Sequence, residues 1–159
     1  IIRDGNVKIA LTHGHTWPDP EALSSNILIM AHHHFTIEFH DPSGLRILGP
    51  IWLTTKWNKS EIASAYLKSK NIRFKNDPLK SFSDKFNFRV KDTRIVVAPT
   101  YNPMLTGRAV NTLSKEEYLG PIFRSQATII EDSQIYLLDG TYLGRLSNLK
   151  KIARESHGY

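Results

Sequence analysis

Apolar residues fall in short runs along this chain, and the first two runs are nearly continuous. Residues 7–11 and 27–31 are rich in β-branched side chains and are bounded by polar or turn-forming residues. Such runs are typical of buried strands in a parallel sheet. The segment between them includes a short helix-compatible stretch, residues 21–23, and is long enough for a compact crossover connection. We therefore expect two adjacent parallel strands that end at the same edge of a sheet.

The remaining pattern predicts a mixture of strands and helices. Residues 35–40 alternate with period two, a turn-forming stretch follows, and residues 45–48 are apolar again, which predicts a β-hairpin. Helices are expected at 60–69, with Ser60 as N-cap, and at 148–155, after Ser147. Further strands are expected at 51–55, 94–98, 127–130, 134–138 and 141–146. The pattern favours one α/β domain over residues 1–159.

Composition places the chain among ordinary globular proteins and excludes several classes of site. The 159 residues are 40% hydrophobic and 23% charged, which fits one domain with a real core. The absence of cysteine excludes disulfides and thiolate metal sites, so that any metal must be held by imidazole and oxygen. No apolar stretch approaches the roughly 18 residues of a membrane span. We expect a cytoplasmic protein that has no membrane partner.

The net charge of +6 is concentrated in one segment. Residues 56–94 hold eleven Lys and Arg against four Asp and Glu. This segment is interpreted as a basic insertion or lid-like part of the domain. Its charge can attract phosphates or nucleic acid, and a solvated lysine-rich surface explains it equally well. Its phenylalanines are expected to be packing anchors more than base-stacking groups.

Five of the seven histidines lie in residues 11–34, in two clusters that directly follow the first two predicted strands. His13 and His15 follow the first strand. His32, His33 and His34 follow the second. Ligands of open α/β sheets bind at the carboxyl edge of the strands. Burying several imidazoles close together is costly, and a bound metal or anion would offset that cost. Neutral imidazole is a ligand for Zn, Mn, Fe and Ni, so the pattern predicts a metal site.

The two histidine motifs and the C-terminal sequence resemble a known enzyme family. The histidine motifs are THGH at 12–15 and AHHH at 31–34. The C-terminal segments are IVVAPTYNPMLTG at 95–107 and YLLDGTYLG at 136–144. Together they resemble the calcineurin-like binuclear metallophosphoesterases, in an archaeal-type branch related to DNA-ligase-associated phosphoesterases. The resemblance runs from about residue 7 to 149 and is weakest over 58–93.

This resemblance implies an αββα sandwich, with mixed sheets flanked by helices, and a two-metal site that hydrolyses phosphomonoesters or phosphodiesters. By motif match the metal ligands are His13, His32 and His34. His15, His33 and Asn102 would then support the ligands from behind or face the substrate. A complete site holds two divalent ions (Mn, Fe, Zn or Ni), with Mn favoured, and nucleotides or nucleic acid are mildly favoured as substrate. Ala31 replaces a glycine of the family motif, which is tolerable unless that position needs a positive φ.

The N-terminal motifs of the family, D-x-H, G-D-x-x-D and G-N-H-D/E, are absent from this sequence. The chain therefore resembles the C-terminal half of the domain, and it carries no match to the family's acid and base residues. Histidines alone supply no negative charge to hold two cations close together, so hydrolysis is expected only with N-terminal ligands. These ligands would come from a separate chain that carries the N-terminal half of the domain. Association of this chain with copies of itself is the alternative. A catalytically inactive remnant and a basic nucleic-acid-binding module remain as alternatives.

Overall fold

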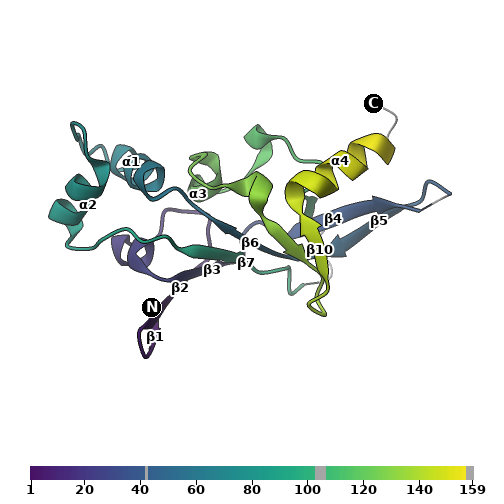
Figure 1. The fold of residues 1–159 in the computed structure, drawn as a ribbon, viewed down its shortest axis with the longest axis horizontal. Helices are drawn as coiled ribbons and strands as arrows, with labels where there is room; N and C mark the ends of the chain where they lie inside the picture. Colours follow the sequence, from purple (N-terminus) through teal and green to yellow (C-terminus); the bar gives the residue numbers. More distant parts are fainter. Residues whose placement is uncertain (42, 103–106, 157–159) are drawn as a thin grey trace.

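The computed structural model describes residues 1–41, 43–102 and 107–156, and for 154–156 it describes the backbone alone. Most strands form one mixed sheet of seven, in the order β1-β2-β3-β7-β6-β9-β10 (Figure 1). Its strands are β1 (Ile2–Asp4), β2 (Val7–Thr12), β3 (Ile27–Met30), β6 (Trp52–Lys56), β7 (Arg94–Val97), β9 (Gln134–Tyr136) and β10 (Tyr142–Arg145). The mixed α/β character expected from the sequence is confirmed.

The first two apolar runs form adjacent parallel strands, as predicted, and β7 adds a third parallel strand beside them. Strands β2 and β3 pair in parallel, with Thr12 opposite Met30, and β3 pairs in parallel with β7, with Met30 opposite Val97. The connection from β2 to β3 contains η1 (Pro20–Ser24), a short 3₁₀ helix where a helical stretch was expected. The carboxyl ends of three strands therefore lie next to one another at one edge of the sheet.

One face of the seven-stranded sheet is covered and forms the core. Its side chains alternate inward along each strand, and Ala10, Leu28, Ile95 and Leu53 are fully buried. The helices α1 (Lys59–Ser69) and α2 (Pro78–Phe86) lie together on one side of the sheet (Figure 1). They contribute the apolar side chains Ile62, Ala63, Tyr66, Leu67 and Phe82 to the same core.

The opposite face of the sheet carries apolar side chains that remain accessible. Alternation and register place Leu11, Ile29 and Val96 in one row across β2, β3 and β7, and Leu11 is 58% exposed. Trp52 and Tyr142 lie on the same face farther along the sheet and are 37% and 51% exposed. An exposed apolar sheet face of this kind is a surface that commonly binds another protein surface. We call it the open face.

A second, three-stranded sheet has the order β5-β4-β8, with β4 (Phe35–His40), β5 (Arg46–Pro50) and β8 (Arg108–Ala109). The antiparallel β4–β5 pair is the hairpin that the sequence predicts. Asn111 clamps this sheet, because its side-chain amide exchanges two hydrogen bonds with the backbone of Glu38. The remaining helices are η2 (Lys115–Glu117), α3 (Pro121–Arg124), η3 (Ile130–Asp132) and α4 (Leu146–Ser156).

Several local predictions need correction. Residues 127–130 do not form a strand in the structure, which has only an isolated bridge at Thr128 and then the 3₁₀ helix η3. The N-cap of α1 is Asn58, whose side chain accepts hydrogen bonds from the amides of Ser60 and Glu61, so Ser60 is not the cap. The final helix begins at Leu146, two residues before the expected start. The two helix boundaries differ from the expected ones by one or two residues, which is the usual uncertainty of helix ends.

The basic segment 56–94 forms the layer of helices that covers the core face. Its helix α2 was not expected from the sequence; Asp77 caps its N-terminus and Asn87 ends it in the left-handed conformation. Phe82 and Phe86 pack against Tyr66 with ring centroids 5.5 and 5.6 Å away. These phenylalanines are packing groups. Within the described ranges, no helix is long and apolar enough to cross a membrane.

Candidate metal and substrate site

The two histidine clusters meet at the carboxyl edge of the parallel strands. The carbonyl of His13, directly after β2, accepts hydrogen bonds from the amides of Ala31 and His32, at 3.2 and 2.8 Å. These bonds continue the parallel pairing one step beyond the strand ends and bring the two motifs side by side. Ala31 is not among the described residues with positive φ, so its replacement of glycine costs the backbone little.

His13 and His32 face each other at the distance of two ligands of one metal ion. The Nε2 atom of His13 lies 3.1 Å from Nδ1 of His32. Two nitrogens that are each about 2.1 Å from one ion lie about 3.0–3.4 Å apart in octahedral or tetrahedral geometry. Without an ion, the same distance suits a hydrogen bond between two neutral rings, one donating and one accepting. The distance between the two nitrogens is therefore compatible with a shared ion as well as with a hydrogen bond.

The electrostatic environment keeps His32 in the form that binds metals. Burial lowers the pKa of His32, and the nearby imidazoles of His13, His15 and His34 lower it further. The His15 ring lies within 5.1 Å of the His13 ring and 5.9 Å of the His32 ring, measured between centroids, and it is exposed. A neutral imidazole has a free lone pair for coordination.

His33 lies beneath the cluster and turns away from solvent. Only 2% of it is exposed, and its ring packs against Phe35 and Phe123. Its Nε2 atom is 2.6 Å from the carbonyl oxygen of Leu119, to which the neutral ring donates. Burial lowers the pKa of His33 to about 4. In this position His33 supports the site from below by fixing the segment around Leu119.

The structure does not bring the third expected ligand into contact with the first two. No ring contact or hydrogen bond among the described residues links His34 to His13 or His32. His34 has a φ of 46°, and its buried Nδ1 atom has no hydrogen-bond partner among the residues that the structure describes. Asn102 is exposed, and its carbonyl accepts a hydrogen bond from the Thr100 hydroxyl. Met104 and its neighbours at 103–106 lie outside the described residues.

The donor set is incomplete for a two-metal centre. Within the parts of the chain that the structure describes, no group of three or more His, Cys, Asp or Glu side chains is arranged to hold a metal ion. His13 and His32 can supply two nitrogens to one ion, and carboxylate ligands would have to come from elsewhere.

A hollow of about 580 Å³ opens beside His15 and His32. One wall comes from the loop after β2, which is anchored by Trp17 against Tyr66 (centroids 5.3 Å apart) and by the hydrogen bond from the Tyr66 hydroxyl to the carbonyl of Pro18. The hollow is lined by His15, Thr16, Trp17, His32, Lys70, Leu119, Gly120, Pro121 and Arg124. Lys70 and Arg124 were not singled out from the sequence, because isolated cations carry no motif.

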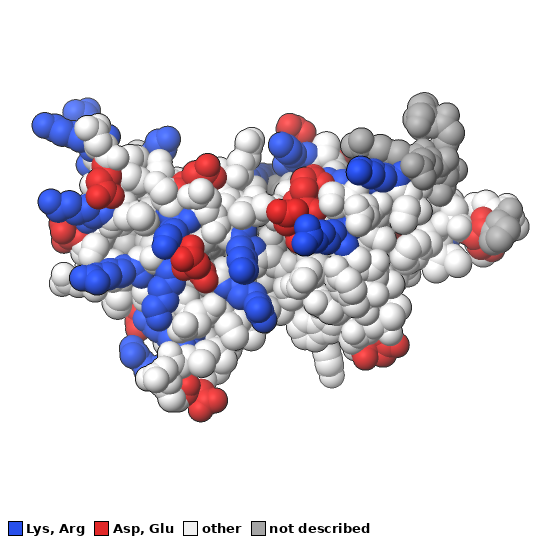
Figure 2. All heavy atoms as spheres, viewed as in Figure 1, with Lys and Arg blue, Asp and Glu red and all other residues white. Residues whose placement is uncertain are grey.

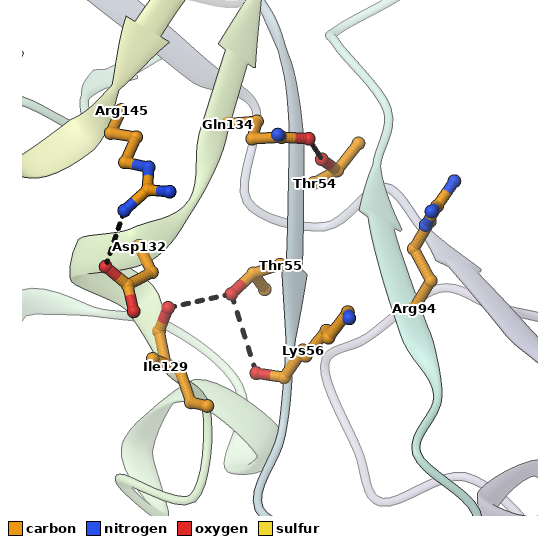
Figure 3. A pocket seen from close by; sticks show the side chains of 8 residues that line it. All are labelled: Thr54, Thr55, Lys56, Arg94, Ile129, Asp132, Gln134 and Arg145. Carbon is orange, nitrogen blue, oxygen red and sulfur yellow. Dashed lines mark hydrogen bonds and ion pairs between the residues drawn. The ribbon is translucent and has the colours of Figure 1, made fainter.

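A second hollow, of about 330 Å³, lies on the open face (Figure 3). Lys56 on β6 and Arg94 on β7 are directly opposite each other in the sheet. Arg145 on the far wall contacts Asp132 at 3.9 Å, whereas Lys56 and Arg94 have no ion pair within the described part of the chain. Figure 2 shows more Lys and Arg over the half of the molecule built by α1, α2 and β2. The histidines do not line this second hollow.

In comparisons with protein-family models, with curated proteins and with solved structures, none matches this chain.

Proposed function

We propose that this chain is the metal-binding C-terminal half of a phosphoesterase of the calcineurin-like binuclear type, and that it acts with N-terminal ligands supplied from outside residues 1–159. The observation that carries the proposal is the 3.1 Å approach of His13 Nε2 and His32 Nδ1 at the carboxyl edge of parallel strands. A bound divalent ion would supply Lewis-acid stabilisation of the charge that develops on a phosphoryl group.

The residues of this chain have distinct parts in that proposal. His13 and His32 would hold one ion, and His34 would reach the second ion once the missing ligands are present. His15 is exposed at the mouth of the hollow, where it can contact a substrate oxygen or exchange a proton. His33 keeps the site in place through Leu119.

The open face supports the need for a partner. Its row of Leu11, Ile29 and Val96 crosses three strands and ends beside the histidine edge. A partner sheet packed on this face would bury apolar surface, which is the main favourable term in protein association. It would also bring its own loops to the edge where His13 and His32 lie. An N-terminal half-domain packed there could thus supply the missing carboxylates.

The direct test is calorimetric titration of the tag-free chain with Mn²⁺ and Zn²⁺. We expect one weakly bound ion per chain, loss of that binding in His13→Ala and His32→Ala, and no hydrolysis of bis(p-nitrophenyl) phosphate by the chain alone. His40→Ala is the matched control, because His40 lies on β4 in the other sheet, 3.7 Å from the Glu38 carboxylate. Unchanged metal binding in the His13 and His32 variants would refute the proposal.

A basic nucleic-acid-binding module is the second candidate function. The observation that favours it is the Lys56–Arg94 pair in the hollow of Figure 3. Like charges directly opposite in a sheet are destabilising, and a phosphate backbone would relieve the repulsion. This candidate predicts oligonucleotide binding that falls steeply with salt and survives EDTA. The double variant Lys56→Gln, Arg94→Gln would remove that binding, and unchanged binding would exclude this candidate.

A further inference from the structure

Arg124 is held so that its charge faces the hollow beside the histidines. Its Nε atom donates a hydrogen bond to the carbonyl of Tyr118, at 3.1 Å. Within the described part of the chain, no carboxylate pairs with its guanidinium. One edge of the planar group is therefore anchored, and the terminal nitrogens are left for a ligand. A guanidinium with two free N–H groups matches the geometry of a phosphate.

Lys70 adds a second unpaired cation to the same hollow. Its ammonium nitrogen lies 5.6 Å from the centroid of the Tyr66 ring, which places the charge over an aromatic face without neutralising it. None of the described residues that line this hollow is acidic. The two cations, Lys70 and Arg124, on one concave surface produce a positive potential that attracts anions.

Lys70 and Arg124 belong to different parts of the sequence. The tertiary fold places both of them at the same hollow. Lys70 follows α1, and Arg124 ends α3. The segment before α3 is fixed by the contact between His33 and the Leu119 carbonyl. The same buried histidine that supports the metal site thus also sets the position of the guanidinium.

We propose that this hollow binds a second phosphate group of the substrate, with Arg124 and Lys70 as its recognition residues. The inference rests on the proposed phosphoesterase function, for which it narrows the substrate class. The scissile phosphate would lie at His13 and His32, and an adjacent phosphate would lie against Arg124 and Lys70. Substrates of this kind are nucleotides with a phosphoanhydride or strands of nucleic acid. A phosphomonoester with an uncharged leaving group would leave both cations without a partner.

The test measures binding to the metal-free chain, in EDTA, by calorimetry with three probes. Orthophosphate carries one phosphate, pyrophosphate carries two linked phosphates, and a short deoxythymidine oligonucleotide represents a phosphodiester strand. The variants are Arg124→Gln and Lys70→Gln. Arg89→Gln and Lys80→Gln are matched controls, because both residues are exposed and lie outside the hollow.

We expect pyrophosphate or the oligonucleotide to bind at least about tenfold more tightly than orthophosphate, and each hollow variant to weaken that binding about tenfold, the usual size of a lost charge-assisted hydrogen bond. The controls should stay within about twofold. Loss with pyrophosphate alone identifies an anhydride substrate, and loss with the oligonucleotide identifies nucleic acid. Equal affinities in all five proteins, or no binding by the unmodified chain, would overturn the inference. Because no metal is present, this result is separate from that of the metal-binding test.

Discussion

The Nε2 atom of His13 and the Nδ1 atom of His32 lie 3.1 Å apart, although nineteen positions separate them in the sequence. The parallel pairing of β2 with β3, extended by two amides that bond to the His13 carbonyl, sets this distance. His13 lies one residue beyond the end of β2 and His32 two residues beyond the end of β3. The strand pairing thus places the two proposed ligands, which would favour precise coordination.

The first prediction separates the roles of the neighbouring histidines. His13→Ala and His32→Ala should remove measurable Zn²⁺ binding, because each deletes a ligand of the pair. His15→Ala should weaken binding by about tenfold, in the range usual for groups that support a ligand. Equilibrium dialysis of the three variants checks this order. A His15 variant that loses all binding would show that His15 is itself a ligand.

The second prediction concerns the dependence of folding stability on pH. Burial lowers the pKa of His33 from 6.5 to about 4, so between these values the unfolded chain binds a proton that the folded chain does not. Stability therefore falls as the pH drops from 6.5 towards 4, by up to about 3 kcal/mol from this residue. Urea unfolding in EDTA at several pH values should show this loss in the unmodified protein.

The control for this effect is His33→Phe, which keeps an aromatic ring between Phe35 and Phe123. At pH 7 it should be less stable, because the Leu119 carbonyl loses its donor. Its stability should fall less between pH 6.5 and 4 than that of the unmodified protein. Parallel curves for the two proteins would contradict the assignment of a buried, neutral His33.

The third prediction tests the close approach of Gly120 to the histidine turn. A Cβ at Gly120 would collide with the carbonyl oxygen of Gly14, between His13 and His15, and Gly120 has a φ of 70°. Gly140 has a similar φ of 88°, but a Cβ there would meet no atom within 4 Å. Gly120→Ala should therefore destabilise the protein by about 2 kcal/mol more than Gly140→Ala, in the range of overpacking costs. Equal losses in denaturant unfolding would mean that the two segments can separate freely.

The fourth prediction concerns the open face. We expect the chain alone to self-associate through this face at high concentration, because exposed apolar sheet surface favours association. Sedimentation velocity should show that Leu11→Lys shifts the protein towards monomer with little change in stability. Leu45→Lys is the control, since Leu45 is 64% exposed on the connection between β4 and β5. An unmodified chain that stays monomeric at high concentration would argue against a docking role for this face.

Much of the sheet can be predicted from the sequence because its signals are local. The apolar runs that became β2 and β3 predict two adjacent parallel strands, and the run that became β7 predicts a buried strand. The histidines that follow β2 and β3 indicate the edge of the sheet that the two strands share. The helix α2 was missed although its sequence carries local signals: Asp77 as N-cap before Pro78, and Leu79, Phe82 and Phe86 at helical spacing. The strand expected at 127–130 does not form: Ala127 and Ile130 are buried in the core, whereas Ile129 is 48% exposed.

In the candidate site, too, some features can be predicted from the sequence and others cannot. The pairing of His13 with His32 follows from strand order, which a pattern of apolar runs and histidines can indicate. The position of His34 depends on its positive φ. A histidine in the sequence does not indicate that its backbone will adopt this conformation. Lys70 and Arg124 enter the hollow from two helices whose relative placement is a tertiary property, so no sequence spacing could connect them.

The proposed phosphoesterase is tested most directly by native mass spectrometry of the protein, purified without denaturation from its own cells in buffer containing Mn²⁺. We expect an assembly or a longer polypeptide that contains this chain together with the D-x-H, G-D-x-x-D and G-N-H-D/E motifs and holds two divalent ions. A lone chain of 18.2 kDa that carries no divalent ion would contradict it.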